Sequence, residues 1–401
     1  MPHDAPLIAT IAVSLALAFV GGFVAVRLRL PPLVGYLLAG IVVGPFTPGF
    51  VADRHLAPQL AEIGVILLMF GVGLHFSMRD LLAVRAVALP GAIGQIAAAT
   101  LLGLGLASWW GWSLGAGLVF WLALSVASTV VLLRALEEGN RLRSPEGRIA
   151  IGWLIVEDLV MVVTLVVLPA LAGALRGEAG AGHDATTGAL AATLALTIGK
   201  IAVFVALMLV VGTRLFPWLL SHVERTRSRE LFTLGVVALA LGVAFGSAEL
   251  FGVSLALGAF FAGVVINQST LSHRAARDSQ PLQDAFTALF FVAVGMLFDP
   301  AILVRQPLQV IAVLAIIVVG KSLAALGIVL ALRYPLRTAL TVAAALAQIG
   351  EFSFILAELG TSLRLLPQEG YSLILAGALL SMALNPLAFA ALARLVPAPQ
   401  A

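Results

Sequence analysis

The sequence predicts an all-α polytopic membrane protein of about thirteen transmembrane helices, arranged as two inverted repeats. The 401 residues are 61% hydrophobic and only 11% charged, and their mean hydropathy is +1.09. Soluble domains do not have this composition. Charged and Gly/Pro-rich clusters break the chain into apolar segments, and short motifs of the first half recur in the second.

Thirteen apolar segments lie between these breaks. About 20 helical residues, at roughly 1.5 Å each, span the hydrocarbon core, so we expect one crossing per segment. The segments are 6–26, 32–51, 59–76, 83–108, 112–136, 149–171, 189–213, 230–247, 250–268, 283–298, 308–331, 336–359 and 370–394.

Most of the 23 basic residues lie in alternate loops, on one side of the predicted membrane. By the positive-inside rule that side is cytoplasmic, so we expect the N-terminus outside and the C-terminus in the cytoplasm. The basic residues are spread over short loops, which argues against a nucleic-acid partner. The absence of cysteine excludes disulfides and thiolate metal sites.

Two pairs of motifs indicate an internal repeat. The motifs AGIVV (39–43) and VGLHF (72–76) resemble AGVVI (262–266) and VGMLF (294–298), which lie about 223 residues later. Both pairs are seven segments apart, and an odd shift reverses the direction through the membrane. We therefore predict inverted repeats over 6–171 and 230–394, joined by a linker helix at 189–213.

Two adjacent acids, Glu157 and Asp158, lie in the middle of the apolar segment 149–171. One acid at a helix centre costs about 2.5–3.5 kcal/mol on insertion scales. The cost is tolerated where the group faces a water-filled cavity or a bound ion. The pair therefore predicts a functional site inside the membrane.

The same offset relates Ser125 and Ser128 in segment 112–136 to Gln348 and Glu351 in segment 336–359. Transporters with inverted repeats place discontinuous helices at corresponding positions of their halves, and freed carbonyls there can hold a cation. The serines could instead bond to their own helix, as is common in membranes. A mid-segment carboxyl group such as Glu351 is harder to explain in that way.

Lys321 lies near the middle of segment 308–331. A buried ammonium group either loses its proton or pairs with a carboxylate, and Glu157 or Asp158 are the expected partners, followed by Glu351. A static ion pair that joins two helices is the alternative. Three other polar residues inside segments are expected to be helix-packing groups: Gln95, Thr164 and Asn385.

Seven motifs together resemble the monovalent cation:proton antiporter-2 family, especially its Kef-type potassium/proton branch. The resemblance covers nearly the whole chain, in order. The motifs are PPLVGYLLAGIVVGP (31–45), EIGVILLMFGVGLHFS (62–77), VEDL (156–159), LALGAFFAGVVI (255–266), FFVAVGML (290–297), GK (320–321) and AQIGEFSFIL (347–356).

This resemblance implies a sodium/proton-antiporter-like fold, with a dimerisation domain and a core domain that contains two crossed discontinuous helices. The crossed helices would be segments 112–136 and 336–359. The resemblance also implies a homodimer in the inner membrane of a bacterial-type cell. It implies no cofactor apart from the transported ions, which are H⁺ with K⁺ or Na⁺.

The resemblance makes Asp158 the carboxylate that binds the proton or the monovalent cation. Glu157 takes a position where relatives carry Asp, Asn or Gln, and Lys321 one where several relatives carry a lysine that pairs with that neighbour. The crossed helices would contribute Ser128 and Thr129 from the first, and Gln348 and Glu351 from the second.

Kef-type proteins usually continue into a cytoplasmic nucleotide-binding regulatory domain. The sequence contains no GxGxxG motif. We therefore expect a transmembrane antiporter domain over 1–396 and a short tail at 397–401, and a regulatory domain would follow the C-terminus.

These features predict antiport of a monovalent cation, K⁺ in preference to Na⁺, against protons by alternating access. The alternative is a potassium channel-like efflux protein gated by a cytoplasmic domain that this sequence does not contain. An anion or organic-solute symporter and a membrane anchor are less consistent with buried acids and a lysine. The sequence has no nucleophile–base pair and no phosphate loop, so we do not expect an enzyme.

Overall fold

The computed structural model describes residues 6–48, 56–76, 78–142, 144–176 and 187–395, and every regular element in these ranges is helical. Among them, eight helices are long and apolar enough to cross a membrane by length and composition, and four shorter apolar helices accompany them. The chain is therefore an all-α, multi-pass membrane protein. The tail 397–401 and the end of segment 32–51 lie outside the described residues.

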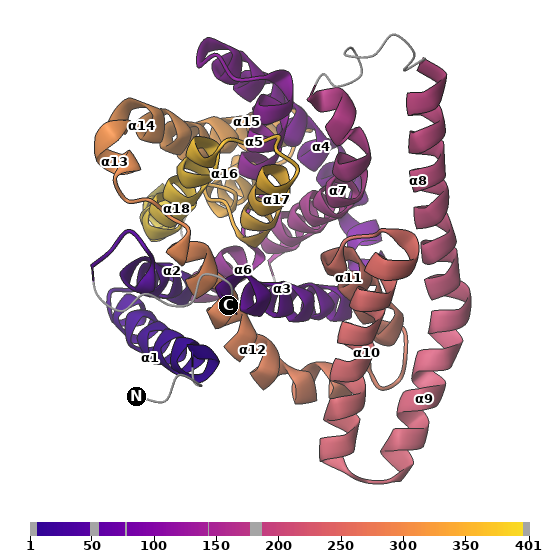
Figure 1. Ribbon diagram of the computed structural model, residues 1–401. Coiled ribbons are helices and arrows are strands. Elements are labelled where there is room, and N and C mark those ends of the chain that lie inside the picture. Colours follow the sequence, from indigo (N-terminus) through magenta and orange to yellow (C-terminus); the bar gives the residue numbers. More distant parts are fainter. Residues whose placement is uncertain (1–5, 49–55, 77, 143, 177–186, 396–401) are drawn as a thin grey trace.

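Six helices, here called the first bundle, occupy the lower part of Figure 1. In this bundle α3 packs on α11 and α12, α12 packs on α2, and α1 covers α2. The helices are α1 (Pro6–Arg27), α2 (Pro32–Val43), α3 (Leu56–His75), α10 (Arg229–Phe251), α11 (Leu255–Asn267) and α12 (Ser272–Met296).

Glycines of the repeated motifs make two close helix crossings in this bundle. A Cβ on Gly40 of α2 would lie only 2.9 Å from the Cα of Gly295 on α12, and one on Gly73 of α3 would lie 3.0 Å from the Cα of Gly263 on α11. Side chains at these positions would push the backbones apart. Each crossing joins one motif of the first half to one of the second, as a two-fold relation between the halves requires.

Most of the other helices form the second bundle, in the upper part of Figure 1. In this bundle α4 packs on α5, α7 and α15, while α16 packs on α7, α15 and α18. The helices are α4 (Met78–Trp109), α5 (Leu114–Ser125), α6 (Thr129–Glu138), α7 (Pro145–Leu175), α14 (Pro307–Ala315), α15 (Lys321–Ala331), α16 (Leu336–Ala345), α17 (Glu351–Ser362) and α18 (Gln368–Leu395), with the short α13 (Ile302–Arg305) leading into α14.

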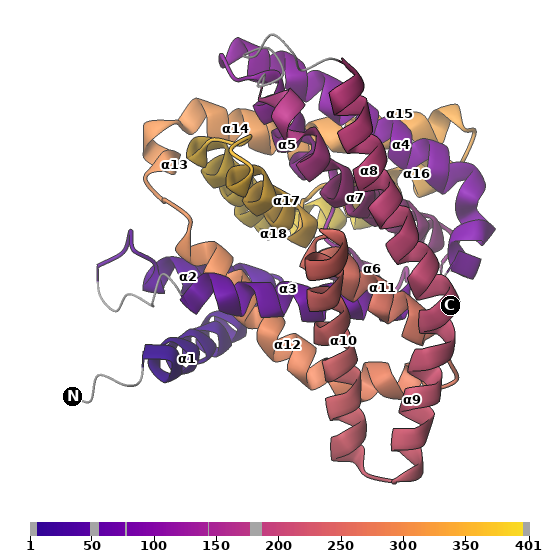
Figure 2. The ribbon, with the colours of Figure 1, turned by 45° about the vertical axis from the view of Figure 1, so that its right-hand side comes forward.

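A long helical column connects the bundles and stands at the edge of the molecule in Figure 1, and in Figure 2 its upper part passes in front of the second bundle. It consists of α8 (Thr187–Leu207), a π-helical turn (Met208–Gly212) and α9 (Thr213–Arg225). The column continues twelve residues past the predicted end at 213. Arg214 ends the apolar run, but Phe216 and Leu220 are four residues apart on one buried face, so the helix continues as an amphipathic one.

Two other boundaries differ from the prediction for local reasons. The break before α11 falls at Gly252, whose φ of +67° ends α10, and Ser254 then caps α11 by accepting a hydrogen bond from the amide of Leu257. Helix α12 starts eleven residues before the predicted position 283, at Ser272. Its polar first turns are held by Asp278, which is within 3.4 Å of Arg274 one helical turn away.

Candidate functional site

Helices α5 and α6 are separated by an extended stretch, 126–128, inside what the sequence predicts as one segment. Val126 has φ −102° and ψ 134°, which ends α5. The Ser128 hydroxyl then accepts a hydrogen bond from the amide of Val131 and caps α6. The backbone polar groups of this stretch are therefore free to bond to side chains of other helices.

A second interruption, 346–350, separates α16 from α17. Gly350 there has extended backbone angles, φ −142° and ψ −151°. A Cβ on Gly350 would collide with the Cα and Cβ of Ser128. Glycine is therefore required by the close approach of the two interruptions, not by its own backbone conformation.

Gln348 links the two interruptions directly. Its Oε1 accepts a hydrogen bond from the Ser128 amide at 2.9 Å, and its Nε2 donates to the Ser128 carbonyl at 3.2 Å. Its Nε2 also lies 3.3 Å from the carbonyl of Ala345, in the last turn of α16. The side chain is fully buried. One amide side chain thus forms hydrogen bonds with backbone groups next to both interruptions, where the regular hydrogen bonds of a continuous helix are missing.

Helix α7 presents Glu157 and Asp158 to the first interruption. The Glu157 Oε2 accepts a hydrogen bond from the Ala127 amide at 2.9 Å, and the Asp158 Oδ2 accepts one from the Thr129 hydroxyl at 3.3 Å. Both acids are buried, with exposed fractions of 0% and 7%. Their other oxygens, Oε1 and Oδ1, have no hydrogen-bond partner among the described residues. These oxygens could accept a proton or ligate a cation.

Glu351, the first residue of α17, joins this acidic group from the second interruption. Its carboxyl group contacts Ser128 and Thr129 at the start of α6 and interacts electrostatically with Asp158. Oε2 of Glu351 is also buried without a partner among the described residues. The N-termini of α6 and α17 therefore both lie beside this acidic group.

Lys321 is buried and follows a π-helical turn, Ile316–Gly320. Its Nζ donates to the backbone carbonyl of Gln348 at 3.1 Å. Lys321 interacts electrostatically with Glu157, but the ion pairs within 4.0 Å in the described part of the chain do not include these two residues. The direct partner is therefore a carbonyl of the second interruption and not one of the three acids expected from the sequence.

Two amide residues that the sequence suggests as helix-packing groups form hydrogen bonds to neighbouring helices, at the ends of α5 and α16. Gln95 of α4 donates to the last carbonyl of α5, that of Ser125, at 2.9 Å and accepts from Trp153 of α7 at 3.1 Å. Asn385 of α18 donates to the Ala344 carbonyl in the last turn of α16, at 3.0 Å. A polar residue inside an apolar segment is the sequence feature that points to a role for Gln95 and Asn385. Their partners are backbone carbonyls, which the sequence does not identify.

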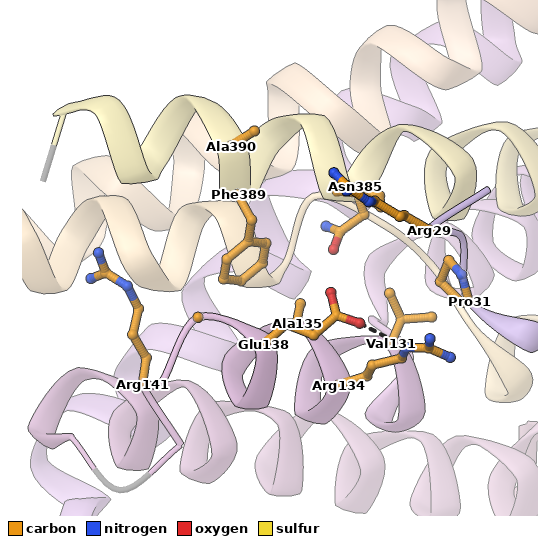
Figure 3. Close-up of a pocket in the computed structure, with 12 residues that line it drawn as sticks. Arg29, Pro31, Val131, Arg134, Ala135, Glu138, Arg141, Asn385, Phe389 and Ala390 are labelled. Carbon is orange, nitrogen blue, oxygen red and sulfur yellow. Dashed lines mark hydrogen bonds and ion pairs between the residues drawn. The ribbon is translucent and has the colours of Figure 1, made fainter. Parts of the chain in front are cut away.

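Two cavities lie between the bundles. Both are near loops of the predicted membrane side that holds most of the basic residues, here called the arginine-rich side. One, of about 970 Å³, is lined by His75, Asn267 and His273 of the first bundle and reaches Leu159 on α7, next to Asp158. The other, of about 320 Å³, lies between the α1–α2 turn, α6 and α18 (Figure 3).

Figure 3 shows the ion pair between Arg134 and Glu138 of α6 on one side of the smaller cavity, and Arg29 of the α1–α2 turn with Asn385 and Phe389 of α18 on the other. The Nε–Oε1 distance of the ion pair is 3.0 Å. Val131, which lines this cavity, is one helical turn from Ser128. The larger cavity thus reaches α7, the helix that carries Glu157 and Asp158, and the smaller one reaches α6, which Ser128 caps.

The described residues contain no group of three or more His, Cys, Asp or Glu side chains arranged to hold a metal ion. The arrangement instead combines single carboxylates with hydroxyl and backbone oxygens. Oxygen ligands of this kind suit hard monovalent cations and protons, not tightly held transition metals.

Comparisons with known proteins agree on one family. The sodium/hydrogen exchanger transmembrane family matches residues 15–395. The chain is 64% identical over 98% of its length to YbaL of Escherichia coli (strain K12), which its name places among cation/proton antiporters, and 33% identical over 98% to K(+) efflux antiporter 4 of Arabidopsis thaliana. It spans 69% and 64% of the lengths of these two relatives.

Among solved structures, the sodium proton antiporter MjNhaP1 from Methanocaldococcus jannaschii resembles the whole chain. The TM-score is 0.70 at 17% identity, with 98% of this chain and 100% of that chain covered. At this identity the likeness shows a shared fold. The chain therefore belongs to the sodium/hydrogen exchanger family, within the Kef-type branch of the monovalent cation:proton antiporter-2 proteins, and is a membrane transporter of that class rather than an enzyme.

Proposed function

We propose that the chain exchanges K⁺ for H⁺ by alternating access and that Asp158 binds either ion in competition. The observation that carries this proposal is the Asp158 carboxyl group, which is buried beside the helix interruption with one oxygen unpartnered among the described residues. A dehydrated cation or a proton would satisfy that oxygen, but not both at once. Competition at one carboxylate couples the two fluxes.

In this proposal α5–α6 and α16–α17 are the two crossed discontinuous helices of the antiporter core. The reciprocal hydrogen bonds between Ser128 and Gln348, and the contact of Gly350 with Ser128, support this assignment. Ser128 and Thr129 would supply further oxygen ligands. Glu351 would add negative charge, and Lys321 would balance Glu157 and the carbonyl of Gln348.

Alternating access requires two bodies that move past each other. Contacts between the two bundles are limited, with α2 touching α18 and α11 touching α7. The cavity of about 970 Å³ opens on the arginine-rich side and reaches Leu159. We infer an inward-open state in which the second bundle, over 78–175 and 302–395, carries the site past the first.

The remaining assignments follow the same proposal. The transmembrane antiporter domain covers 1–396, as repeats over 6–171 and 230–394 around the linker. The protein is a homodimer in a bacterial-type inner membrane, with its N-terminus outside and its C-terminus in the cytoplasm. The names of K(+) efflux antiporter 4 and of the glutathione-regulated potassium-efflux system protein KefC of Cronobacter sakazakii favour K⁺ as the cation.

Proton movement in proteoliposomes that carry a pH gradient tests this proposal. We expect added K⁺, more than Na⁺, to collapse the gradient with the wild-type protein and not with Asp158→Asn. Asp299→Asn is the matched control, because Asp299 lies outside the site and pairs with Arg305 at 3.5 Å. It should transport normally.

Two outcomes would overturn the assignment. Cation-dependent proton movement in a folded Asp158→Asn variant would exclude Asp158 as the shared binding group. A K⁺ current without proton movement would favour the channel-like alternative, in which the acidic group would act in selectivity or gating.

A further inference from the structure

A groove of about 760 Å³ lies on the outer flank of the second bundle, away from the site proposed for transport. It runs between α4 and α7, and the α15–α16 turn closes one end. Gly152 of α7 lies against Val84 of α4, where a Cβ would collide with the Val84 side chain, so the two helices are in close contact along the groove. Ala83 and Ala86 of α4 are exposed and leave its side open to the surroundings of the bundle.

The walls of the groove are aliphatic over most of its length. Besides the alanines of α4, they include Ile149, Ile151 and Ile155 of α7. An open groove with such walls, on the lipid-facing side of a membrane protein, matches a hydrocarbon chain in polarity. The aliphatic part does not offer a hydrogen-bonding ligand any polar contact.

Two polar side chains stand at the arginine-rich end of the groove. Arg148 of α7 and Tyr334 of the α15–α16 turn both line it. Within the described ranges, neither side chain makes an ion pair or a hydrogen bond to another residue. A guanidinium group and a phenol with unused hydrogen-bond donors can both bind a phosphate group.

The dimensions of the groove agree with one leaflet. Arg148 and Ile155 are seven residues apart on α7, which is about 10 Å along the helix axis. The hydrocarbon region of one leaflet is about 15 Å deep, half of the usual core. A headgroup at Arg148 would therefore place the first part of an acyl chain along Ile151 and Ile155.

We propose that this groove is a binding site for one anionic phospholipid of the leaflet on the arginine-rich side. Arg148 and Tyr334 hold its phosphate, and an acyl chain fills the space between α4 and α7. Helix α7 carries Glu157 and Asp158 two and three residues beyond Ile155. The lipid therefore supports the helix that positions the acidic group, and its loss loosens that helix against α4.

Lipid retention by the purified protein in a non-ionic detergent tests the site without any transport assay. Dioleoylphosphatidylglycerol or dioleoylphosphatidylcholine is added, retained lipid is counted by native mass spectrometry, and Tm is followed over the same titration. We expect one more tightly retained phosphatidylglycerol than phosphatidylcholine and a higher Tm with the anionic lipid. Arg148→Gln should weaken retention about tenfold, because it removes one charge-assisted contact.

Two further variants separate a built site from general charge attraction. Ala86→Trp keeps both polar groups but fills the aliphatic part, so it should also lose the retained lipid. Arg85→Gln is the control, since Arg85 is an exposed neighbour on α4 that does not line the groove. The proposal is wrong if Arg148→Gln and Ala86→Trp retain as much phosphatidylglycerol as Arg85→Gln, or if phosphatidylcholine is retained equally well. Displacement of the lipid by glycerol phosphate alone would also contradict it, because the acyl chain would then contribute nothing.

Discussion

Replacing Gln348 by leucine tests whether one amide side chain holds the two helix interruptions together. Leucine has nearly the same volume and can make none of the three hydrogen bonds of Gln348. The Ser128 carbonyl keeps the amide of Leu132 as a partner at 3.1 Å. The Ser128 amide keeps no hydrogen-bond partner among the described residues.

The expected loss can be worked from these contacts. A buried amide left without a partner costs about 1–3 kcal/mol, and each of the other two hydrogen bonds contributes about 0.5–1.5 kcal/mol. The free energy of unfolding should therefore fall by roughly 2–6 kcal/mol. Larger chains shift Tm less per kcal/mol than small domains, so a decrease of roughly 3–10 °C is expected.

Thermal unfolding of the purified protein in detergent measures this difference. Gln283→Leu is the matched control, since Gln283 is a half-buried amide of the first bundle whose one side-chain hydrogen bond among the described residues goes to the Ser279 hydroxyl. It should lower Tm by a degree or two at most. If Gln348→Leu unfolds at the same temperature as this control, the two interruptions do not depend on the amide bridge, and the proposed architecture of the core loses its main support.

Two other substitutions probe the same region. Gly350→Ala should reduce both stability and proton exchange, because its Cβ would collide with Ser128 and separate the interruptions; an overpacking cost of about 1–3 kcal/mol is expected, and an unchanged Tm would contradict the close approach. Lys321→Ala leaves the Gln348 carbonyl without its donor and Glu157 without a nearby positive charge. It should lower Tm or shift the pH profile of exchange in proteoliposomes, and a variant with neither change would remove Lys321 from the mechanism.

The acidic group could be predicted from the sequence because its signal is local. Glu157 and Asp158 are conspicuous inside an apolar segment, whatever surrounds them in the fold. The shared offset of about 223 residues then related Ser128 to Glu351, and these side chains do meet in the structure. Their roles in binding ions remain predictions.

The partner of Lys321 could not be predicted in the same way. Buried charge suggests a carboxylate, but the structure provides the backbone carbonyl of Gln348. A carbonyl is present in every residue and becomes available only where a helix is interrupted. The partners of Gln95 and Asn385 could not be predicted for the same reason, since both donate to carbonyls near the ends of neighbouring helices.

The predicted helix boundaries were wrong where a helix continues into polar residues. The polar start of α12 and the amphipathic α9 are helical because i, i+4 contacts and one buried face stabilise them, although neither is apolar enough to count as a membrane segment. Hydropathy marks the part of a helix that partitions into lipid, but it does not indicate where the helix begins or ends.

The sequence by itself determined the class of the protein, its apolar segments, the family and the acids that the membrane must accommodate. Composition and periodicity reflect transfer into lipid, which depends on each residue and its close neighbours. Only the tertiary structure decided that Gly40 meets Gly295, that Gln348 bridges two interruptions, and that a groove beside α7 ends at Arg148 and Tyr334. These features arise from contacts between residues far apart in the chain, and their energies depend on distances that a sequence does not contain.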